Sequence, residues 1–354
     1  MVRVADGPTV APAAATGIGS LPGIHTREWS ITLAGELPDF PHVPELPGRG
    51  PGADMIGRTA GLLATVAPDM AVETTPSGWR FASTPGREMA RAASWLGEDL
   101  DGIEEALAGR AVTLKAQLVG PWTLAAKIEM RTGERAVRDH GACRDLAGAL
   151  AEASARHIAD LRRRLPDARI ILQLDEPALP TVLAGGVSTA SGMATYRSVD
   201  DQRAQLLLGQ VVASVHGAGA VPGVHCCDAR APIELLRRSG VEMLSVDATV
   251  LTDDQEDSLA AAVEAGLLIL LGYSSTTPLA MSGPQALGEA IAGRALEQYA
   301  RWGIPADVAN AAVALTPACG LADASPEWAR LTYAGLGIAG RIARDEAATD
   351  GVGV

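Results

Sequence analysis

Residues 168–176 read ARIILQLDE, and residues 266–272 read GLLILLG. Both stretches are short apolar runs, the pattern typical of strands that are buried on both faces of a parallel sheet. The first run ends on two carboxylates, Asp175 and Glu176, where the strand would give way to a loop. These stretches predict a parallel sheet that is covered by helices and has polar groups at its carboxyl edge.

Similar runs recur along the chain and alternate with segments of helical periodicity. The clearest such segment, residues 144–165, has apolar residues at i, i+3 and i+4 and stops before Pro166. Strands that alternate with helices predict a single (β/α)₈ TIM-type barrel with its active site at the carboxyl ends of the strands. An open doubly wound sheet is the alternative, but no G-x-G-x-x-G follows the first strand. The expected strands are 14–20, 69–73, 112–118, 169–175, 221–226, 242–247, 266–272 and 312–318, and further helices are expected at 257–264, 286–300 and 327–344.

The barrel is expected to span residues 14–344 as one domain. Residues 1–13 read as a flexible lead and residues 345–354 as a flexible tail. Pro and Gly cluster at 41–52, which predicts a long, stiff loop of functional importance.

Composition narrows the functional classes. The chain has 354 residues, 47% of them hydrophobic, and a formal net charge of −13, which argues against a general nucleic-acid or anionic-membrane binder but does not exclude one local basic pocket. No run of about 18 apolar residues is present, so no membrane-spanning helix is expected. Four cysteines are too few for a disulfide scaffold, and the amino-terminal residues lack the apolar core of a signal peptide. A cytoplasmic protein with reduced thiols is therefore expected.

Rare residue types gather at the predicted strand ends. His225 and Cys227 are two residues apart, so both side chains point to the same side of an extended segment. Cys319 and Asp247 follow two other strands, and a barrel brings all these ends to one mouth. Imidazole, thiolates and a carboxylate suit Zn²⁺, which predicts a zinc site. The alternative is that these are unrelated core residues, since buried cysteine often behaves as a small hydrophobe.

Two further groups are candidates for binding substrate. Asp175 or Glu176 could bind an amine or act as a base, although a capping carboxylate explains either residue equally well. The backbone at Gly19 and Ser20 could bind a carboxylate, with an ordinary turn as the alternative.

The motifs GIGSLPG, LVGPWTLA, ILQLDEPAL, GVHCCDA, LSVDA and TPACGL resemble the catalytic carboxyl-terminal domain of cobalamin-independent methionine synthase. That family lies within the superfamily that includes uroporphyrinogen decarboxylase, and the resemblance covers about residues 14–340. It implies a (β/α)₈ barrel in a single-barrel form, with zinc held by His225, Cys227, Asp247 and Cys319. It also implies that Asp175 binds the amine of homocysteine and that the backbone of Ile18, Gly19 and Ser20 lies near its carboxylate.

Four departures from the family pattern bear on function. Asp247 stands where the family has a glutamate ligand, and the carboxylate of the family's H-G-E segment is missing, with Glu73 a loose substitute. The family's proton-donating histidine is also missing near Tyr273, and the second barrel that helps to hold folate is absent.

We therefore expect a zinc-dependent S-methyltransferase that methylates a thiol, most simply homocysteine to methionine. The methyl donor is either 5-methyltetrahydrofolate, the family default, or a methyl-corrinoid delivered by a partner protein. The acidic chain and the missing histidine favour the methyl-corrinoid. The alternatives are a corrinoid-dependent methyltransferase for another thiol and a non-catalytic zinc-binding barrel.

Overall fold

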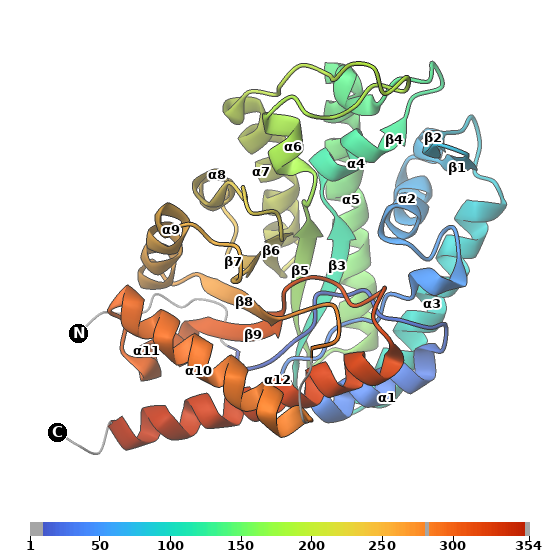
Figure 1. Cartoon of the computed structure of the whole chain (residues 1–354). Coiled ribbons are helices and arrows are strands. Elements are labelled where there is room, and N and C mark those ends of the chain that lie inside the picture. Colours follow the sequence, from blue (N-terminus) through green and yellow to red (C-terminus); the bar gives the residue numbers. More distant parts are fainter. Residues whose placement is uncertain (1–9, 280–282, 351–354) are drawn as a thin grey trace.

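The computed structural model describes residues 10–279 and 283–350 of the chain. Its centre is a curled parallel sheet of six strands in the order β3-β5-β6-β7-β8-β9, with helices packed around the outside (Figure 1). Every residue of β3 and β8 is buried, and for β8 this confirms the prediction from its continuous apolar run. The strands are β3 (Thr113–Val119), β5 (Arg169–Asp175), β6 (Val221–Cys226), β7 (Met243–Asp247), β8 (Leu268–Ser274) and β9 (Val313–Pro317).

The helices follow the predicted alternation. In α5 the Asp139 side chain accepts a hydrogen bond from the Ala142 N–H at the start, and the helix ends at Arg164, two residues before Pro166. The four predicted helices correspond to α5, α9, α10 and α12. The bounds are α1 (Thr26–Glu36), α2 (Met55–Val66), α3 (Arg87–Leu107), α4 (Pro121–Lys127), α5 (His140–Arg164), α6 (Leu179–Leu183), α7 (Asp201–Gly217), α8 (Ile233–Arg238), α9 (Asp253–Glu264), α10 (Pro284–Trp302), α11 (Ala306–Ala312) and α12 (Pro326–Asp350).

Two extended segments, residues 14–21 and 41–45, lie between β9 and β3 without forming regular strands. The first pairs with β9 through one isolated parallel bridge, and the second pairs with β3 in the same way. The Leu21 N–H donates to the Glu45 carbonyl at 2.8 Å, which joins the two segments. The predicted first strand, 14–20, is therefore an irregular extended segment at its expected place beside the last strand.

The predicted second strand, 69–73, is wrong. Residues Val72–Thr75 form β1, which pairs antiparallel with β2 (Gly78–Phe81) in a small separate sheet that also contains β4 (Ile128–Glu129). The place beside β3 is taken by residues 41–45, within the segment read as a Pro-rich loop. Proline lacks the N–H that a ladder needs, so Pro41 and Pro44 prevent a continuous strand there. The fold is thus a barrel-like α/β fold whose regular sheet covers six of the eight expected positions.

The described residues extend the ordered fold beyond the predicted domain limits. Val10 is buried, and α12 continues to Asp350, past the predicted end of the barrel at 344. Residues 1–9 of the predicted lead and 351–354 of the predicted tail lie outside the described residues. Within the described part of the chain, no helix is both long and apolar enough to span a membrane.

Candidate active site

Three of the predicted zinc ligands meet at the carboxyl edge of the sheet. His225 lies in β6, Cys227 follows that strand, and Cys319 follows β9. Their ligand atoms lie within 4.8 Å of one another, and the two Sγ atoms are 3.2 Å apart. Alternation along β6 sends the buried Cys226 side chain the other way, into the main hydrophobic core.

The hydrogen bonding of His225 leaves one nitrogen available to a metal ion. Its Nδ1 lies 2.9 Å from the Ser245 hydroxyl of β7, whereas its Nε2 is buried and has no partner among the described residues. A buried polar atom without a partner is costly, so its place beside two thiols fits an ion. One imidazole and two thiols form a donor set suited to zinc. The contact of Nδ1 with Ser245 holds the imidazole ring in its orientation, as the hydrogen bond on the other nitrogen does in histidines that bind metal.

The two thiols form a hydrogen bond with each other. This hydrogen bond lowers the pKa of the Cys319 thiol, the His225 imidazole adds to the effect, and burial opposes it. The same hydrogen bond, together with burial, raises the pKa of Cys227. Cysteine binds metal as the thiolate, so the direction of the Cys319 shift favours metal binding.

Asp247 is not part of this group. Although it ends β7 as predicted, its Oδ1 accepts hydrogen bonds from the Thr249 N–H at 2.8 Å and the Thr249 hydroxyl at 2.6 Å. Among residues 10–279 and 283–350, the cluster of close ligand atoms comprises the histidine and the two cysteines. Ligation of zinc by Asp247 stays a prediction.

A cavity of about 200 Å³ opens beside the three ligands. Ile18, Ser20 and Asp175, which sequence reasoning assigned to the substrate, line it together with His225. The bend at Gly19 is held tightly, because a Cβ there would lie 2.7 Å from the Gln117 side chain. The remaining lining residues are Met55, Pro177, Cys227, Cys319, Gly320 and Ala322.

The structure separates the roles of the two adjacent carboxylates. Asp175 faces the cavity. Glu176 instead caps the start of α4, where its oxygens accept hydrogen bonds from the Trp122 N–H, the Thr123 N–H and the Thr123 hydroxyl. The capping alternative is therefore correct for Glu176, and Asp175 is the candidate for binding substrate.

Glu45, which sequence reasoning missed, does not line the cavity but lies behind Ser20, which does. Its Oε1 accepts a hydrogen bond from the Ser20 hydroxyl at 2.5 Å, and the side chain is buried. Burial raises the pKa of Glu45 to about 7, although Arg58 acts against this shift. Glu73, the carboxylate suggested for this position, lies in the small sheet and pairs with Arg80 at 2.7 Å. That suggestion is wrong because Glu73 follows the mispredicted second strand.

Two buried polar side chains, Lys115 and Gln173, form hydrogen bonds with residues that line the cavity. The Lys115 ammonium donates to the Ile18 carbonyl at 2.7 Å, and the Gln173 amide donates to the same oxygen at 3.0 Å and to Asp175 at 2.7 Å. Burial lowers the pKa of Lys115 to about 7 and raises that of Asp175 to about 6, and the attraction between the two opposes both shifts. The sequence contains a signal for these buried polar residues. They occupy alternate positions within otherwise apolar strands, as K-x-Q in β3 and Q-x-D in β5.

A histidine and two cysteines that could hold a metal ion lie beside a cavity lined by a buried carboxylate at the carboxyl edge of a barrel-like sheet, an arrangement typical of an enzyme site. Residues 101–337 match the family described as the catalytic domain of cobalamin-independent synthase. The chain belongs to this family and is a methyltransferase. Membership supports, in broad terms, methyl transfer to homocysteine, and the family is zinc-dependent in general.

One solved structure supports the fold. The chain resembles a B12-independent methionine synthase from Shewanella sp. W3-18-1 in complex with selenomethionine, with a TM-score of 0.60 and 12% identity over 96% of this chain and 100% of that one. A D-psicose 3-epimerase from Clostridium cellulolyticum H10 matches at a TM-score of 0.42, with 10% identity over 95% of this chain and 98% of the other. No curated protein matches the sequence significantly.

Proposed function

We propose that the protein is a zinc-dependent S-methyltransferase that methylates homocysteine to methionine. The observation that carries the proposal is the placement of His225, Cys227 and Cys319 on one wall of a cavity whose other walls include Asp175 and Ser20. Zinc bound by these ligands would lower the pKa of a coordinated substrate thiol, so that the sulfur is a thiolate at neutral pH.

The charges around the cavity favour a substrate that carries an ammonium group. When both carboxylates are ionised, Glu45 and Asp175 outnumber the single Lys115 ammonium that interacts with them. Arg58 also lies near Glu45 and shares the Asp99 carboxylate with Arg49, so it compensates part of the Glu45 charge and leaves Asp175 as the main partner for an ammonium. A buried negative charge is costly unless it is paired, so the ammonium of an amino-acid thiol balances the site.

The chain's other residues orient the substrate. Lys115 and Gln173 both donate to the Ile18 carbonyl and so hold the segment 18–20 in place. The Ser20 hydroxyl is already committed to Glu45. Because the Ser20 hydroxyl is occupied, we infer that the substrate carboxylate contacts the backbone around Gly19. This arrangement would present the thiol to the ligand wall, where its sulfur forms a bond to the methyl carbon as the donor releases it.

The decisive experiment is a methyl-transfer assay with the zinc-loaded protein, homocysteine and three donors in parallel: 5-methyltetrahydrofolate, methylcobalamin and a methylated corrinoid protein. The proposal expects methionine from at least one donor. Zinc-loaded protein that is folded but forms no methionine from any of them would count against it. The same assay with other small thiols in place of homocysteine tests the second candidate, a methyltransferase for another thiol.

A further inference from the structure

A buried ion-pair network joins α1, α2 and α3 to the residues that follow the segment 41–45. Its centre is Asp99 of α3, which is fully buried and accepts hydrogen bonds from three side chains. Arg49 donates to both carboxylate oxygens, at 2.8 and 2.7 Å, while Arg58 of α2 donates to Oδ2 at 2.6 Å. The Thr26 hydroxyl of α1 donates to Oδ1 at 2.6 Å. Because Arg49 contacts both oxygens of Asp99, the charge of Arg58 is only partly neutralised there.

Arg58 connects this network to the wall of the metal-site cavity. The same Nη1 that donates to Asp99 also donates to the Pro44 carbonyl at 3.0 Å. The next residue, Glu45, accepts the hydrogen bond from the Ser20 hydroxyl, and Ser20 lines the cavity. An unbroken series of contacts therefore runs from α3 through Arg58 and Glu45 to the substrate side of the cavity wall.

The contact with the Pro44 carbonyl matters because of the composition of its segment. Pro41 and Pro44 have no N–H, so the segment 41–45 cannot form the full set of backbone hydrogen bonds that would hold a strand in register. A buried carbonyl that lacks a partner is costly, and the Arg58 guanidinium, which is only 3% exposed, supplies one. Arg58 thus fixes the backbone immediately before Glu45.

Arg58 also acts on the charge of Glu45. Burial raises the pKa of Glu45 to about 7, and the positive charge of Arg58 is the strongest influence in the opposite direction. The other charged groups that face Glu45 are Asp175 of β5 and Asp54 before α2, which raise its pKa, and Lys115 of β3, which Glu45 helps to keep protonated. The ionisation of Glu45 therefore depends on Arg58 more than on any other of these charges.

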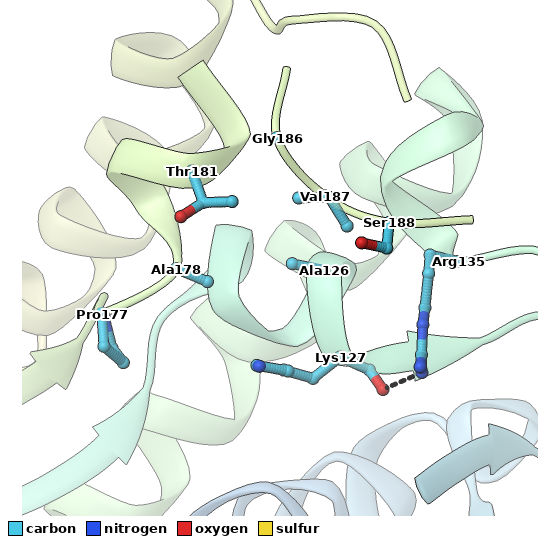
Figure 2. A pocket seen from close by; sticks show the side chains of 9 residues that line it. All are labelled: Ala126, Lys127, Arg135, Pro177, Ala178, Thr181, Gly186, Val187 and Ser188. Atoms are coloured by element: carbon cyan, nitrogen blue, oxygen red, sulfur yellow. Dashed lines mark hydrogen bonds between the residues drawn. The ribbon is translucent and has the colours of Figure 1, made fainter. Parts of the chain in front are cut away.

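Two further cations lie near the metal-site cavity but reach it from another side. Pro177 lines this cavity and also an adjoining one of about 390 Å³. Figure 2 shows Lys127, at the end of α4, extending toward Pro177, with Arg135 at the other border of the adjoining cavity, where its guanidinium donates to the Lys127 carbonyl at 2.8 Å. Arg58 approaches from α2 instead, so the two groups of cations can be varied separately.

We propose that Arg58 and Asp99 are positioning residues for the substrate pocket: Arg58 holds the segment that carries Glu45 and balances the Glu45 charge, and Asp99 holds Arg58. The inference rests on the proposed function, because the ammonium of the substrate is the group that an ionised Glu45 favours. Neither residue is among those that line the cavity, so both act on the substrate through Glu45 and Ser20. Their charges are opposite, so loss of Arg58 favours the protonated form of Glu45 and loss of Asp99 favours the ionised form.

The first measurement follows the ionisation of Glu45 in the zinc-loaded full-length protein without substrate. Infrared difference spectra against the Glu45→Gln variant, recorded on both sides of neutral pH, isolate the Glu45 carboxyl band. Arg58→Met is expected to raise the titration midpoint by about one pH unit, and Asp99→Asn to lower it by a smaller amount because Asp99 acts through Arg58. Arg58→Met leaves Asp99 bonded to Arg49 and Thr26, so the fold is expected to survive.

Two controls separate this role from a general effect of charge or of packing. Lys127→Met removes a cation beside the adjoining cavity, and Arg164→Met removes an arginine that joins α5 to α3 through Asp101 and Glu104, each at 2.7 Å. Both controls are expected to keep the wild-type midpoint of Glu45. The proposal is overturned by an unchanged midpoint in Arg58→Met or Asp99→Asn, by shifts of the same sign in both, or by an equal shift in either control.

The second measurement is calorimetric binding of homocysteine at neutral pH. A midpoint raised by one pH unit lowers the ionised fraction of Glu45 from about one half to about one tenth, so Arg58→Met should weaken binding by up to about fivefold. In the Glu45→Gln background Arg58→Met should have no such effect, and an equal loss there would show that Arg58 does not act through Glu45.

Failure of this inference is distinguishable from failure of the proposed function. A Glu45 midpoint that moves as expected in a protein that neither binds nor methylates homocysteine would refute the methyltransferase assignment and leave the network. Methylation of homocysteine by an Arg58→Met enzyme with an unchanged Glu45 midpoint and unchanged affinity would refute the network and leave the methyltransferase.

Discussion

Replacing Glu45 with glutamine removes one of the two carboxylates proposed to balance the substrate ammonium while keeping its size and its ability to accept the Ser20 hydrogen bond. A charge-assisted hydrogen bond contributes about 1.5–3 kcal/mol, which corresponds to roughly 10- to 150-fold in affinity. Glu45 is only 3% exposed, so solvent screening reduces this little. With a pKa of about 7, part of the wild-type population is protonated at neutral pH, which lowers the expected effect toward tens-fold.

The assay is methionine formation by the zinc-loaded enzyme across pH 6 to 8 at varied homocysteine concentration. In the wild type the KM should fall as pH rises through the pKa of Glu45, because ionisation creates the partner for the ammonium. In Glu45→Gln the KM should be higher and its pH dependence flatter, with kcat changed only a few-fold.

Glu73→Gln is the matched control, since Glu73 is a half-exposed glutamate paired with Arg80 away from the site. A Glu45→Gln enzyme with wild-type KM, or a Glu73→Gln enzyme with the same rise in KM, would refute the reasoning.

The remaining predictions concern the metal and the second carboxylate. Cys227→Ser and Cys319→Ser should each lose most of the bound zinc by elemental analysis, while Cys226→Ser, whose thiol lies in the hydrophobic core, should retain it; full zinc in Cys319→Ser would remove that residue from the site. Asp247→Ala should retain more zinc than either ligand variant because the Asp247 carboxylate is bonded to Thr249, and an emptied site would show that it ligates after all. Asp175→Asn should raise the KM for homocysteine about ten-fold or more with zinc content unchanged, and unaltered kinetics would place Asp175 outside the substrate pocket.

The regular part of the fold was predictable because buried parallel strands have a simple sequence pattern. All six strands of the main sheet coincide with predicted runs to within a few residues. The strand pattern failed where prolines interrupt the backbone hydrogen bonds between neighbouring strands. Residues 41–45 occupy the place beside β3, but Pro41 and Pro44 give that segment the composition of a loop. The pattern therefore predicts the second strand at 69–73 instead.

The site was predictable to the extent that it lies at the ends of those strands. His225, Cys227, Cys319 and Asp175 follow directly from this rule. Glu45 could not be found in the same way, because it belongs to the segment 41–45, whose prolines give it the composition of a loop. The separation of Asp175 from Glu176 also needed the structure, since adjacent residues on an extended chain point in opposite directions and sequence does not say which one faces the cavity.

The central claim is that a substrate thiol binds at the wall formed by His225, Cys227 and Cys319. X-ray absorption at the zinc edge, recorded on the zinc-loaded protein with and without homocysteine, tests it directly. Homocysteine is expected to add one sulfur neighbour to the zinc, whereas homoserine, which has a hydroxyl in place of the thiol on the same carbon chain, is expected to add none. A zinc environment that is unchanged by saturating homocysteine would contradict the account and indicate a closed, structural site.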